Sequence, residues 1–303
     1  MREIRSCESR SCESRSCENP FSHADVRESF PATVGLTQRS AQRKYAGRRK
    51  GFLRVWVREG ILAPAAFLIG VPMSRQIVIG DIHGCWDELR DLLDVLAQSA
   101  DDALIAVGDL VNRGPDSAAV LRFFRDDPRA RSVRGNHEQD HIDADDGAGT
   151  GARAGGSVRR LGRSASATRE QLGPEYSAWL DFMRGLPTAL ELTRATVMHG
   201  LWEPGVPPER QRDAVRVATD AAEAELTARW GPAWYEHYDG PGPLIVGHHH
   251  YRRDGQPLII PGRVYALDTG CVFGGRLTAL VLPEWRIVSV PARRQYYQPR
   301  TAR

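Results

Sequence analysis

The sequence predicts a layered α/β domain over residues 73–303, because short apolar runs alternate there with helical patterns. Six runs rich in Val, Ile, Leu or Ala each end in a polar cluster, and we expect them to be strands. They are Gln76–Ile79, Ala103–Val107, Arg131–Val133, Thr196–Met198, Leu244–Val246 and Val264–Leu267. Two later runs, Leu277–Leu282 and Ile287–Val290, look antiparallel, so we expect mixed strand pairing.

Three helices are predicted between these strands. The segment Ser117–Phe124 follows a Pro-Asp pair, which suits a helix start. The segment Glu209–Trp230 is rich in Ala and Arg, and we expect one long helix there. The segment Asp87–Gln98 places four leucines on one face at helical spacing: Leu89, Leu92, Leu93 and Leu96.

The stretch Asp143–Thr168 is rich in Gly, Ala, Ser and Arg and offers little to bury. We expect a loop here. Two interpretations stay open: a mobile lid beside the functional site, or a disordered insertion without a role.

Residues 1–72 differ from the rest of the chain. They contain the tandem repeat RSCES-RSCES-RSCEN, whose period matches neither a helix face nor a strand, and a basic stretch with both lysines of the chain. We expect a disordered basic extension or non-native upstream sequence, with Met73 opening the folded domain. A basic tail that contacts an acidic partner is the functional alternative.

Charge, cysteine content and the length of the apolar stretches argue against a nucleic-acid-binding protein, a disulfide-rich secreted protein and a membrane protein. The formal net charge is only +3, so the sequence gives no clear nucleic-acid surface. Outside the repeat only Cys85 and Cys271 remain, too few for a disulfide framework. The most apolar stretch, Ile61–Pro72, is shorter than the roughly 20 residues that a membrane helix needs. We expect a cytoplasmic protein with no membrane partner.

The polar clusters that follow the strands are predicted to converge, because loops at the carboxyl ends of strands gather at one edge of such a sheet. Their side chains offer carboxylate, amide and imidazole ligands without a thiolate, a set that suits Mn²⁺, Fe or Zn²⁺. The set is large enough for two ions, and Asp109 is the candidate bridge between them. The six candidate ligands are Asp81, His83, Asp109, Asn136, His199 and His248.

These clusters resemble the signature of the phosphoprotein phosphatase family of calcineurin-like metallophosphoesterases. The matching blocks are Gly80-Asp81-Ile82-His83-Gly84, Gly108-Asp109-Leu110-Val111-Asn112-Arg113-Gly114, Gly135-Asn136-His137-Glu138, His199-Gly200 and Gly247-His248. The resemblance covers residues 73–303 and none of 1–72. It implies a four-layer β-sandwich with mixed sheets flanked by helices.

The resemblance also implies roles. Metal one would be held by Asp81, His83 and Asp109, and metal two by Asp109, Asn136, His199 and His248. His137 would be the general acid in a direct attack by metal-bound hydroxide. Arg113 would bind the phosphate, because a guanidinium can hold two phosphate oxygens at once. Arg134 is a further substrate-binding candidate, with a loop-bracing salt bridge as its alternative; His249 and His250 are expected to be neighbours of the metals rather than ligands.

Asn112 bears on the substrate. The family's protein phosphatases usually carry Asp here, and that carboxylate favours the protonated form of the catalytic histidine. Asn112 can orient His137 by a hydrogen bond but supplies no charge. Weaker acid assistance suits a diphosphate leaving group better than a serine alkoxide.

The segments Asp109–Pro115 and Leu267–Leu280 also resemble the branch of symmetrical bis(5′-nucleosyl)-tetraphosphatases. We therefore expect a dinucleoside tetraphosphate hydrolase that uses two divalent ions, Mn²⁺ first, and splits diadenosine tetraphosphate into two ADP. A serine/threonine protein phosphatase, with a phosphoprotein as partner, is the alternative.

Three further points remain. A nucleic-acid-end phosphatase of the kinase-phosphatase type is a remote alternative, since no GxxxxGK[ST] loop occurs. A non-catalytic binding module is equally remote, because no ligand of the motif is missing. Five aromatic residues could stack on adenine, although core packing is the more usual role: Trp202, Trp230, Trp234, Tyr235 and Tyr238.

Overall fold

The computed structural model describes residues 74–149, 161–252 and 254–298, so the predictions for residues 1–72 lie outside the described residues. Two five-stranded sheets form within the described part. The first has the order β10-β9-β1-β2-β3. Its strands are β1 (Gln76–Ile79), β2 (Ala103–Ala106), β3 (Ala130–Ser132), β9 (Arg276–Leu282) and β10 (Arg286–Pro291). Strands β1, β2 and β3 are parallel, whereas β9 runs antiparallel to β1 and to β10.

The second sheet has the order β4-β5-β6-β8-β7. Its strands are β4 (Ala189–Glu191), β5 (Thr196–Met198), β6 (Leu244–Val246), β7 (Leu258–Ile260) and β8 (Val264–Ala266). Strands β5, β6 and β8 are parallel, and β4 and β7 pair antiparallel at the two edges. The eight predicted strands are confirmed to within about one residue at each end; β4 and β7 had not been predicted.

The two sheets pack face to face. Alternate residues of each strand point in opposite directions, so each strand contributes both to the space between the sheets and to an outer face. Val78 of β1 and Ile245 of β6 belong to one buried cluster that lies between the sheets. Their neighbours Ile77 and Leu244 face outward, into two separate clusters that the helices cover.

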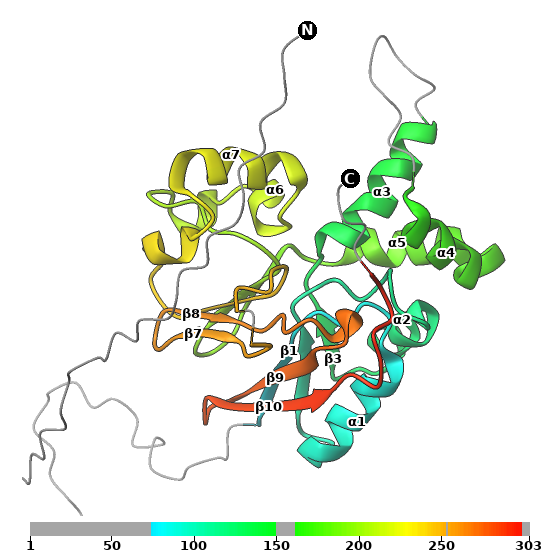
Figure 1. Ribbon diagram of the computed structural model, residues 1–303, viewed down its shortest axis with the longest axis horizontal. Helices are drawn as coiled ribbons and strands as arrows, with labels where there is room; N and C mark the ends of the chain where they lie inside the picture. The colour runs from blue at the N-terminus through cyan, green and yellow to red at the C-terminus, as the bar shows by residue number, and fades with distance from the viewer. Residues whose placement is uncertain (1–73, 150–160, 253, 299–303) are drawn as a thin grey trace, which may run out of the picture. The chain divides into compact units, whose positions relative to one another are not determined.

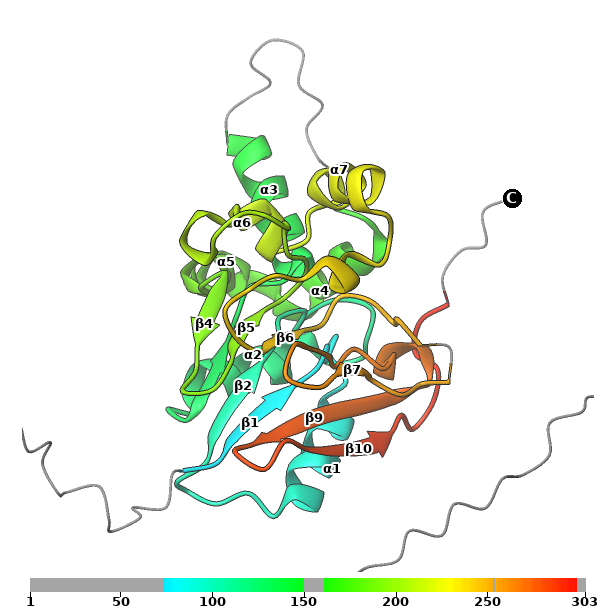
Figure 2. The same ribbon diagram turned by 90° about the vertical axis from the view of Figure 1, so that its left-hand side faces the viewer.

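The helices complete a four-layer sandwich, as the resemblance implied. Helices α1 (Trp86–Leu96) and α2 (Ser117–Asp126) share a buried cluster with the outer face of the first sheet. Helix α7 (Asp220–Trp230) does the same for the second sheet. The leucine face predicted for α1 is buried. Three of the remaining helices pack together at one end of the sandwich (Figures 1 and 2): α3 (Asn136–Gly149), α4 (Arg163–Leu172) and α5 (Tyr176–Gly185). The short helix α6 (Asp213–Arg216) lies beside α7.

The loop predicted for 143–168 was wrong where the structure describes it. Helix α3 continues to Gly149 and α4 begins at Arg163, while residues 150–160 lie outside the described part. Side-chain contacts hold the end of α3 against α5, because Arg184 donates to Asp145 at 2.8 Å and to Asp146 at 2.7 Å. The described residues of this stretch therefore form helices rather than a loop. Ser164 nevertheless lies beside Arg113, whose backbone N–H donates to its Oγ at 2.6 Å.

The single helix predicted for Glu209–Trp230 was also wrong. It is divided into a 3₁₀ turn at Pro208–Arg210, α6 and α7. Ala218 adopts a left-handed conformation with φ 59°, which a continuous helix does not allow. The Thr219 side chain then caps α7 by accepting from the backbone N–H of Ala222. No helix among the described residues is long and apolar enough to cross a membrane.

Candidate metal centre and active site

The carboxyl ends of the parallel strands lie at one edge of the sandwich and bring the predicted ligands together. Asp81 and His83 follow β1, Asp109 follows β2, and Asn136 opens α3 after β3. The second sheet supplies the two remaining histidines from the ends of β5 and β6. All six predicted ligands are connected through direct contacts: Asp81, His83, Asp109, Asn136, His199 and His248.

Asp109 lies at the centre of this group. Its Oδ2 is 3.5 Å from Nε2 of His83, and its Oδ1 is 3.5 Å from Nε2 of His199. The ligand atoms of Asp81, Asp109 and His199 lie within 4.8 Å of one another. The same limit holds for His83, Asp109 and His137. A carboxylate that reaches both groups has the geometry that a bridging ligand requires.

The backbone orients two of the histidines. His83 donates from Nδ1 to the carbonyl oxygen of Val111 at 3.0 Å, and His199 donates from Nδ1 to that of Val107 at 2.9 Å. Each ring therefore turns the lone pair of Nε2 toward Asp109. Burial lowers the pKa of His83 to about 3 and that of His199 to about 4. Both are then neutral at physiological pH, the form that binds metals.

Asn136 joins the remaining ligands. Its Oδ1 lies 2.9 Å from Nε2 of His199 and 3.1 Å from Nδ1 of His248. The backbone N–H of His248 donates to both carboxylate oxygens of Asp81, at 3.2 and 3.1 Å. The loop after β6 is thereby attached to the loop after β1, so both sheets contribute to one site.

Buried carboxylates make the centre electrostatically suited to cations. Burial, reinforced by Asp268 and Asp109, raises the pKa of Asp81 well above its usual range. Burial raises the pKa of Asp109 to about 7. Divalent cations would offset this cost, and oxygen and imidazole donors suit Mn²⁺, Fe and Zn²⁺. The residues present therefore fit the metals that the sequence predicted. Asp268, which follows β8, had been recognised only as part of a strand-end cluster.

The backbone at the site is unusually constrained. Five residues of the site have left-handed backbone conformations, which non-glycine residues seldom adopt. They are His83 (φ 48°), Asp109 (φ 51°), Asn112 (φ 72°), Arg113 (φ 69°) and His248 (φ 71°). Gly247 allows a close approach as well, since a Cβ there would lie 2.0 Å from Oδ1 of Asp81.

Glu138 organises the loop that carries Asp109, a role the sequence had not suggested. It is fully buried and accepts four backbone N–H groups. Three belong to Asp109, Leu110 and Val111, and the fourth is that of Gly135 at 2.8 Å. The Gly-Asn-His-Glu block contained this residue, but its spacing alone gave no indication that its partner is the loop after β2.

Asn112 and His137 form the contact predicted for them. Nδ2 of Asn112 donates to Nδ1 of His137 at 2.8 Å. Oδ1 of Asn112 accepts from Nε2 of His141 at 2.9 Å, and Tyr176 donates its hydroxyl to Nδ1 of His141 at 2.8 Å. Because Nδ1 of His137 accepts the last hydrogen bond of this series, the proton of the neutral ring lies on Nε2, which is 4.0 Å from Oδ2 of Asp109. Burial also holds the pKa of His137 well below its usual range, so the imidazole is neutral.

The two predicted phosphate-binding arginines lie in different places. Nη1 of Arg113 is 2.8 Å from Nε2 of His83, and its guanidinium lies over the ring of Phe273. Arg134 lines a separate pocket of about 320 Å³ with Gln139 and Asp213. Its Nε is buried and has no hydrogen-bond partner among the described residues. The structure thus places Arg113 in the ligand cluster and leaves the role of Arg134 a prediction.

Comparison with known proteins identifies the family. The family model described as calcineurin-like phosphoesterase matches residues 74–265. The chain belongs to this family. It is a metallophosphoesterase, and enzymes of this family hydrolyse phosphoesters with divalent metals.

Several relatives of this metallophosphoesterase carry tetraphosphatase names. The chain is 30% identical to the asymmetrical bis(5′-nucleosyl)-tetraphosphatase PrpE of Halalkalibacterium halodurans, over 71% of this chain and 93% of the relative. It is 32% identical to the symmetrical enzyme of Aromatoleum aromaticum, over 72% of this chain and 97% of the relative. The match to the symmetrical enzyme of Shewanella baltica is 38% identical but covers only 47% of that relative. A solved structure described as a candidate diadenosine tetraphosphatase is similar with a TM-score of 0.57 and 30% identity, covering 73% of this chain and 95% of that one.

The aromatic residues considered for adenine stacking fill the core of the metallophosphoesterase instead. Trp202, Trp234 and Tyr238 are at most 5% exposed, and Trp230 and Tyr235 pack against the same cluster. Trp202 donates to Oδ1 of Asp239 at 2.7 Å, and Trp234 donates to the hydroxyl of Tyr251 at 2.8 Å. Nε1 of Trp230 is buried and has no partner among the described residues. The core interpretation is confirmed for Trp202, Trp234 and Tyr238.

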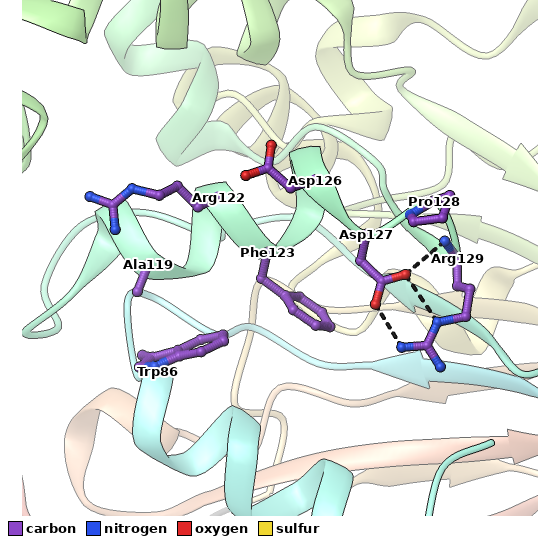
Figure 3. Close-up of a pocket in the computed structure, with 8 residues that line it drawn as sticks. All are labelled: Trp86, Ala119, Arg122, Phe123, Asp126, Asp127, Pro128 and Arg129. Carbon is purple, nitrogen blue, oxygen red and sulfur yellow. Dashed lines mark hydrogen bonds and ion pairs between the residues drawn. The ribbon is translucent and has the colours of Figure 1, made fainter. Parts of the chain in front are cut away.

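A groove of about 710 Å³ lies outside the metal centre, between α1 and α2. Figure 3 shows Trp86 and Phe123 facing each other across it, with the paired side chains of Asp127 and Arg129 at one end. None of the predicted site residues lines this groove. The strand-end cluster is therefore the candidate site because of its side chains and not because of cavity size.

Proposed function

We propose that this metallophosphoesterase hydrolyses dinucleoside tetraphosphates and splits diadenosine tetraphosphate into two ADP. Two relatives matched over nearly their whole length support the tetraphosphate substrate, one named asymmetrical and one symmetrical. Cleavage into two ADP follows the symmetrical relative. The observation that carries the proposal is the contact between the neutral side chains of Asn112 and His137. It orients His137 as a hydrogen-bond donor but does not stabilise the imidazolium, the stronger acid that a poor leaving group demands. A diphosphate leaves as an anion and needs little protonation.

The metal assignment follows the contacts around Asp109. Asp81, His83 and Asp109 would hold one ion, and Asp109, Asn136, His199 and His248 the other, with Mn²⁺ as the first expectation. Bound divalent ions supply polarisation of the phosphoryl group and a more acidic water. Asp109 supports this assignment, because its two oxygens face histidines from different sheets at 3.5 Å each.

The remaining residues would bind and orient the substrate. Arg113 lies close enough to the ligand cluster to hold a phosphate with its paired N–H groups. His137 would donate from Nε2 to the leaving oxygen as the bond breaks. Nε of Arg134 is buried and has no partner within the described part of the chain, which supports a role in binding a more distant phosphate.

A substrate panel on the full chain with Mn²⁺ tests the proposal. Diadenosine tetraphosphate should be preferred over a phosphoserine peptide, and ADP should be the sole nucleotide product. Products of AMP and ATP would contradict symmetrical cleavage. A clear preference for the phosphopeptide would instead support a protein phosphatase.

Two substitutions test the residue roles. Asp109→Asn should abolish turnover, and His137→Ala should reduce it by about 10²- to 10⁴-fold, the usual range for a general acid. His237→Ala is the control, since this residue lies in the turn after α7 and not among the predicted ligands. Wild-type turnover by either site variant would refute the assigned role.

A further inference from the structure

Glu223 of α7 contacts two of the three consecutive histidines that follow β6. Its Oε2 lies 3.1 Å from Nε2 of His248, and its Oε1 lies 2.6 Å from Nε2 of His249. The two imidazole rings are themselves adjacent, with centroids 4.1 Å apart. One carboxylate therefore holds both rings, and it comes from a helix on the outer face of the second sheet.

The opposite edge of the His248 ring faces the ligand cluster. Nδ1 of His248 lies 3.1 Å from Oδ1 of Asn136, and that oxygen is 2.9 Å from Nε2 of His199. A neutral imidazole can coordinate a metal only through the nitrogen that lacks a proton. Glu223 and Oδ1 of Asn136 can both only accept, so they compete for the single proton of a neutral His248 ring. The charged carboxylate of Glu223 is the stronger acceptor and favours the proton on Nε2, which leaves the lone pair of Nδ1 directed toward Asn136 and the ligand cluster.

We propose that Glu223 is a positioning residue, which fixes the tautomer and the orientation of His248 for metal binding. The inference rests on the proposed function for the assignment of His248 as a ligand. Partners on the far nitrogen of a ligating histidine commonly have this effect. Here the partner belongs to a helix separate from all the strand-end motifs, so the affinity of the second metal depends on the placement of α7.

The contacts argue against a direct metal-binding role for Glu223 and His249. Both oxygens of Glu223 are occupied by imidazole nitrogens. Nε2 of His249 lies closer to Glu223 than Nε2 of His248 does, at 2.6 Å against 3.1 Å, and the His249 side chain is 40% exposed. His250 is held in a similar way, with Nε2 3.0 Å from Oδ2 of Asp268. Among these three histidines, His248 is the one with a described contact from its second nitrogen to a predicted ligand, through Oδ1 of Asn136.

Metal affinity in three variants tests the proposal. Glu223→Ala removes both acceptors, and Glu223→Gln keeps one acceptor oxygen and removes the charge. Glu225→Gln is the matched control, because Glu225 lies on the same helix, is 55% exposed and pairs with Arg212. We expect Mn²⁺ binding, measured by calorimetry on the full chain, to weaken about 10- to 100-fold for the second ion in Glu223→Ala. It should weaken less in Glu223→Gln and stay unchanged in Glu225→Gln.

A spectroscopic measurement separates orientation from charge. In the metal-free wild type, the ¹⁵N spectrum should show His248 protonated at Nε2, and Glu223→Ala should give a mixture of tautomers. Activity of this variant should recover at saturating Mn²⁺, which loss of folding would not allow. Unchanged Mn²⁺ affinity and an unchanged tautomer in the alanine variant would overturn the proposal. If that variant does not fold, the glutamine variant decides by the same two measurements.

The outcomes also separate this inference from the proposed function. If the wild type binds two Mn²⁺ ions but does not hydrolyse diadenosine tetraphosphate, the substrate assignment fails while the affinity test of Glu223 still applies. If His248→Ala leaves Mn²⁺ binding unchanged, His248 is not a ligand and the inference about Glu223 is overturned.

Discussion

Replacing Asn112 by aspartate changes the charge beside the predicted general acid with little change in shape. The substituted carboxylate would lie where Nδ2 of Asn112 now lies, 2.8 Å from Nδ1 of His137. His141 would still donate from Nε2 to the other oxygen, as it does now at 2.9 Å. The variant should therefore fold normally.

The expected effect on His137 follows from Coulomb's law. With charge centres about 4–5 Å apart and an effective dielectric constant of about 20, the carboxylate stabilises the imidazolium by about 3–4 kcal/mol. One pKa unit corresponds to about 1.4 kcal/mol, so the pKa of His137 should rise by about 2–3 units from its present depressed value. The protonated acid would then assist poor leaving groups.

A comparison of two substrates measures this effect. In Asn112→Asp, kcat/KM for a phosphoserine peptide should rise about tenfold or more relative to kcat/KM for diadenosine tetraphosphate. The optimum for the peptide should also move to higher pH, since a raised pKa keeps the acid protonated to higher pH. Gln256→Glu is the control, because it makes the same chemical change at an exposed side chain outside the predicted site. An unchanged substrate ratio in Asn112→Asp would refute this role of Asn112.

Two further predictions concern metal binding and the stability of the fold. Gly247→Ala should abolish metal binding, because its Cβ would lie 2.0 Å from Oδ1 of Asp81, whereas Gly242→Ala, with no atom within 4 Å, should bind Mn²⁺ normally in calorimetry. Asp102→Asn should lower the free energy of unfolding by about 2 kcal/mol at pH 7, since the buried carboxylate accepts hydrogen bonds from Arg75. These bonds lower the pKa of Asp102, so its contribution is present above the unfolded pKa of about 3.9 and is lost as pH falls through the folded value. Urea unfolding should therefore show the two proteins converging below about pH 4, and a difference that persists there would contradict the ion-pair explanation.

The metal cluster could be predicted because its residues follow directly after short apolar strands. In each motif the polar side chain is local to the strand that positions it, as with Asp81 after β1 and His248 after β6. Strands β4 (Ala-Leu-Glu) and β7 (Leu-Ile-Ile) are only three residues long and lead into no candidate metal ligand, so they had no comparable signal. Their positions depend on pairing with β5 and β8, which only the folded sheet provides.

The helical errors have a similar origin. The composition of Glu209–Trp230 favours a helix throughout, and the break is imposed by contacts with the loop after β5. Gly200 donates to the carbonyl oxygen of Arg216 at 2.8 Å, and a Cβ on Gly200 would lie 2.2 Å from that of Ala218. Local propensity was overridden by the requirement to place this segment against the site.

Three imidazoles of the site, those of His83, His199 and His248, are held by groups whose role the ligand motifs do not reveal. Two are held by backbone carbonyls of the loop after β2, which have no side-chain signature at all. Glu223 holds a third from a helix that the sequence suggested only as part of a longer one. The motif therefore determines which atoms can bind a metal, whereas the tertiary fold determines which nitrogen of each ring faces it. If this division is correct, substitutions at Glu223 should change metal affinity while leaving the ligand residues themselves unaltered, and substitutions of the ligands should abolish binding outright.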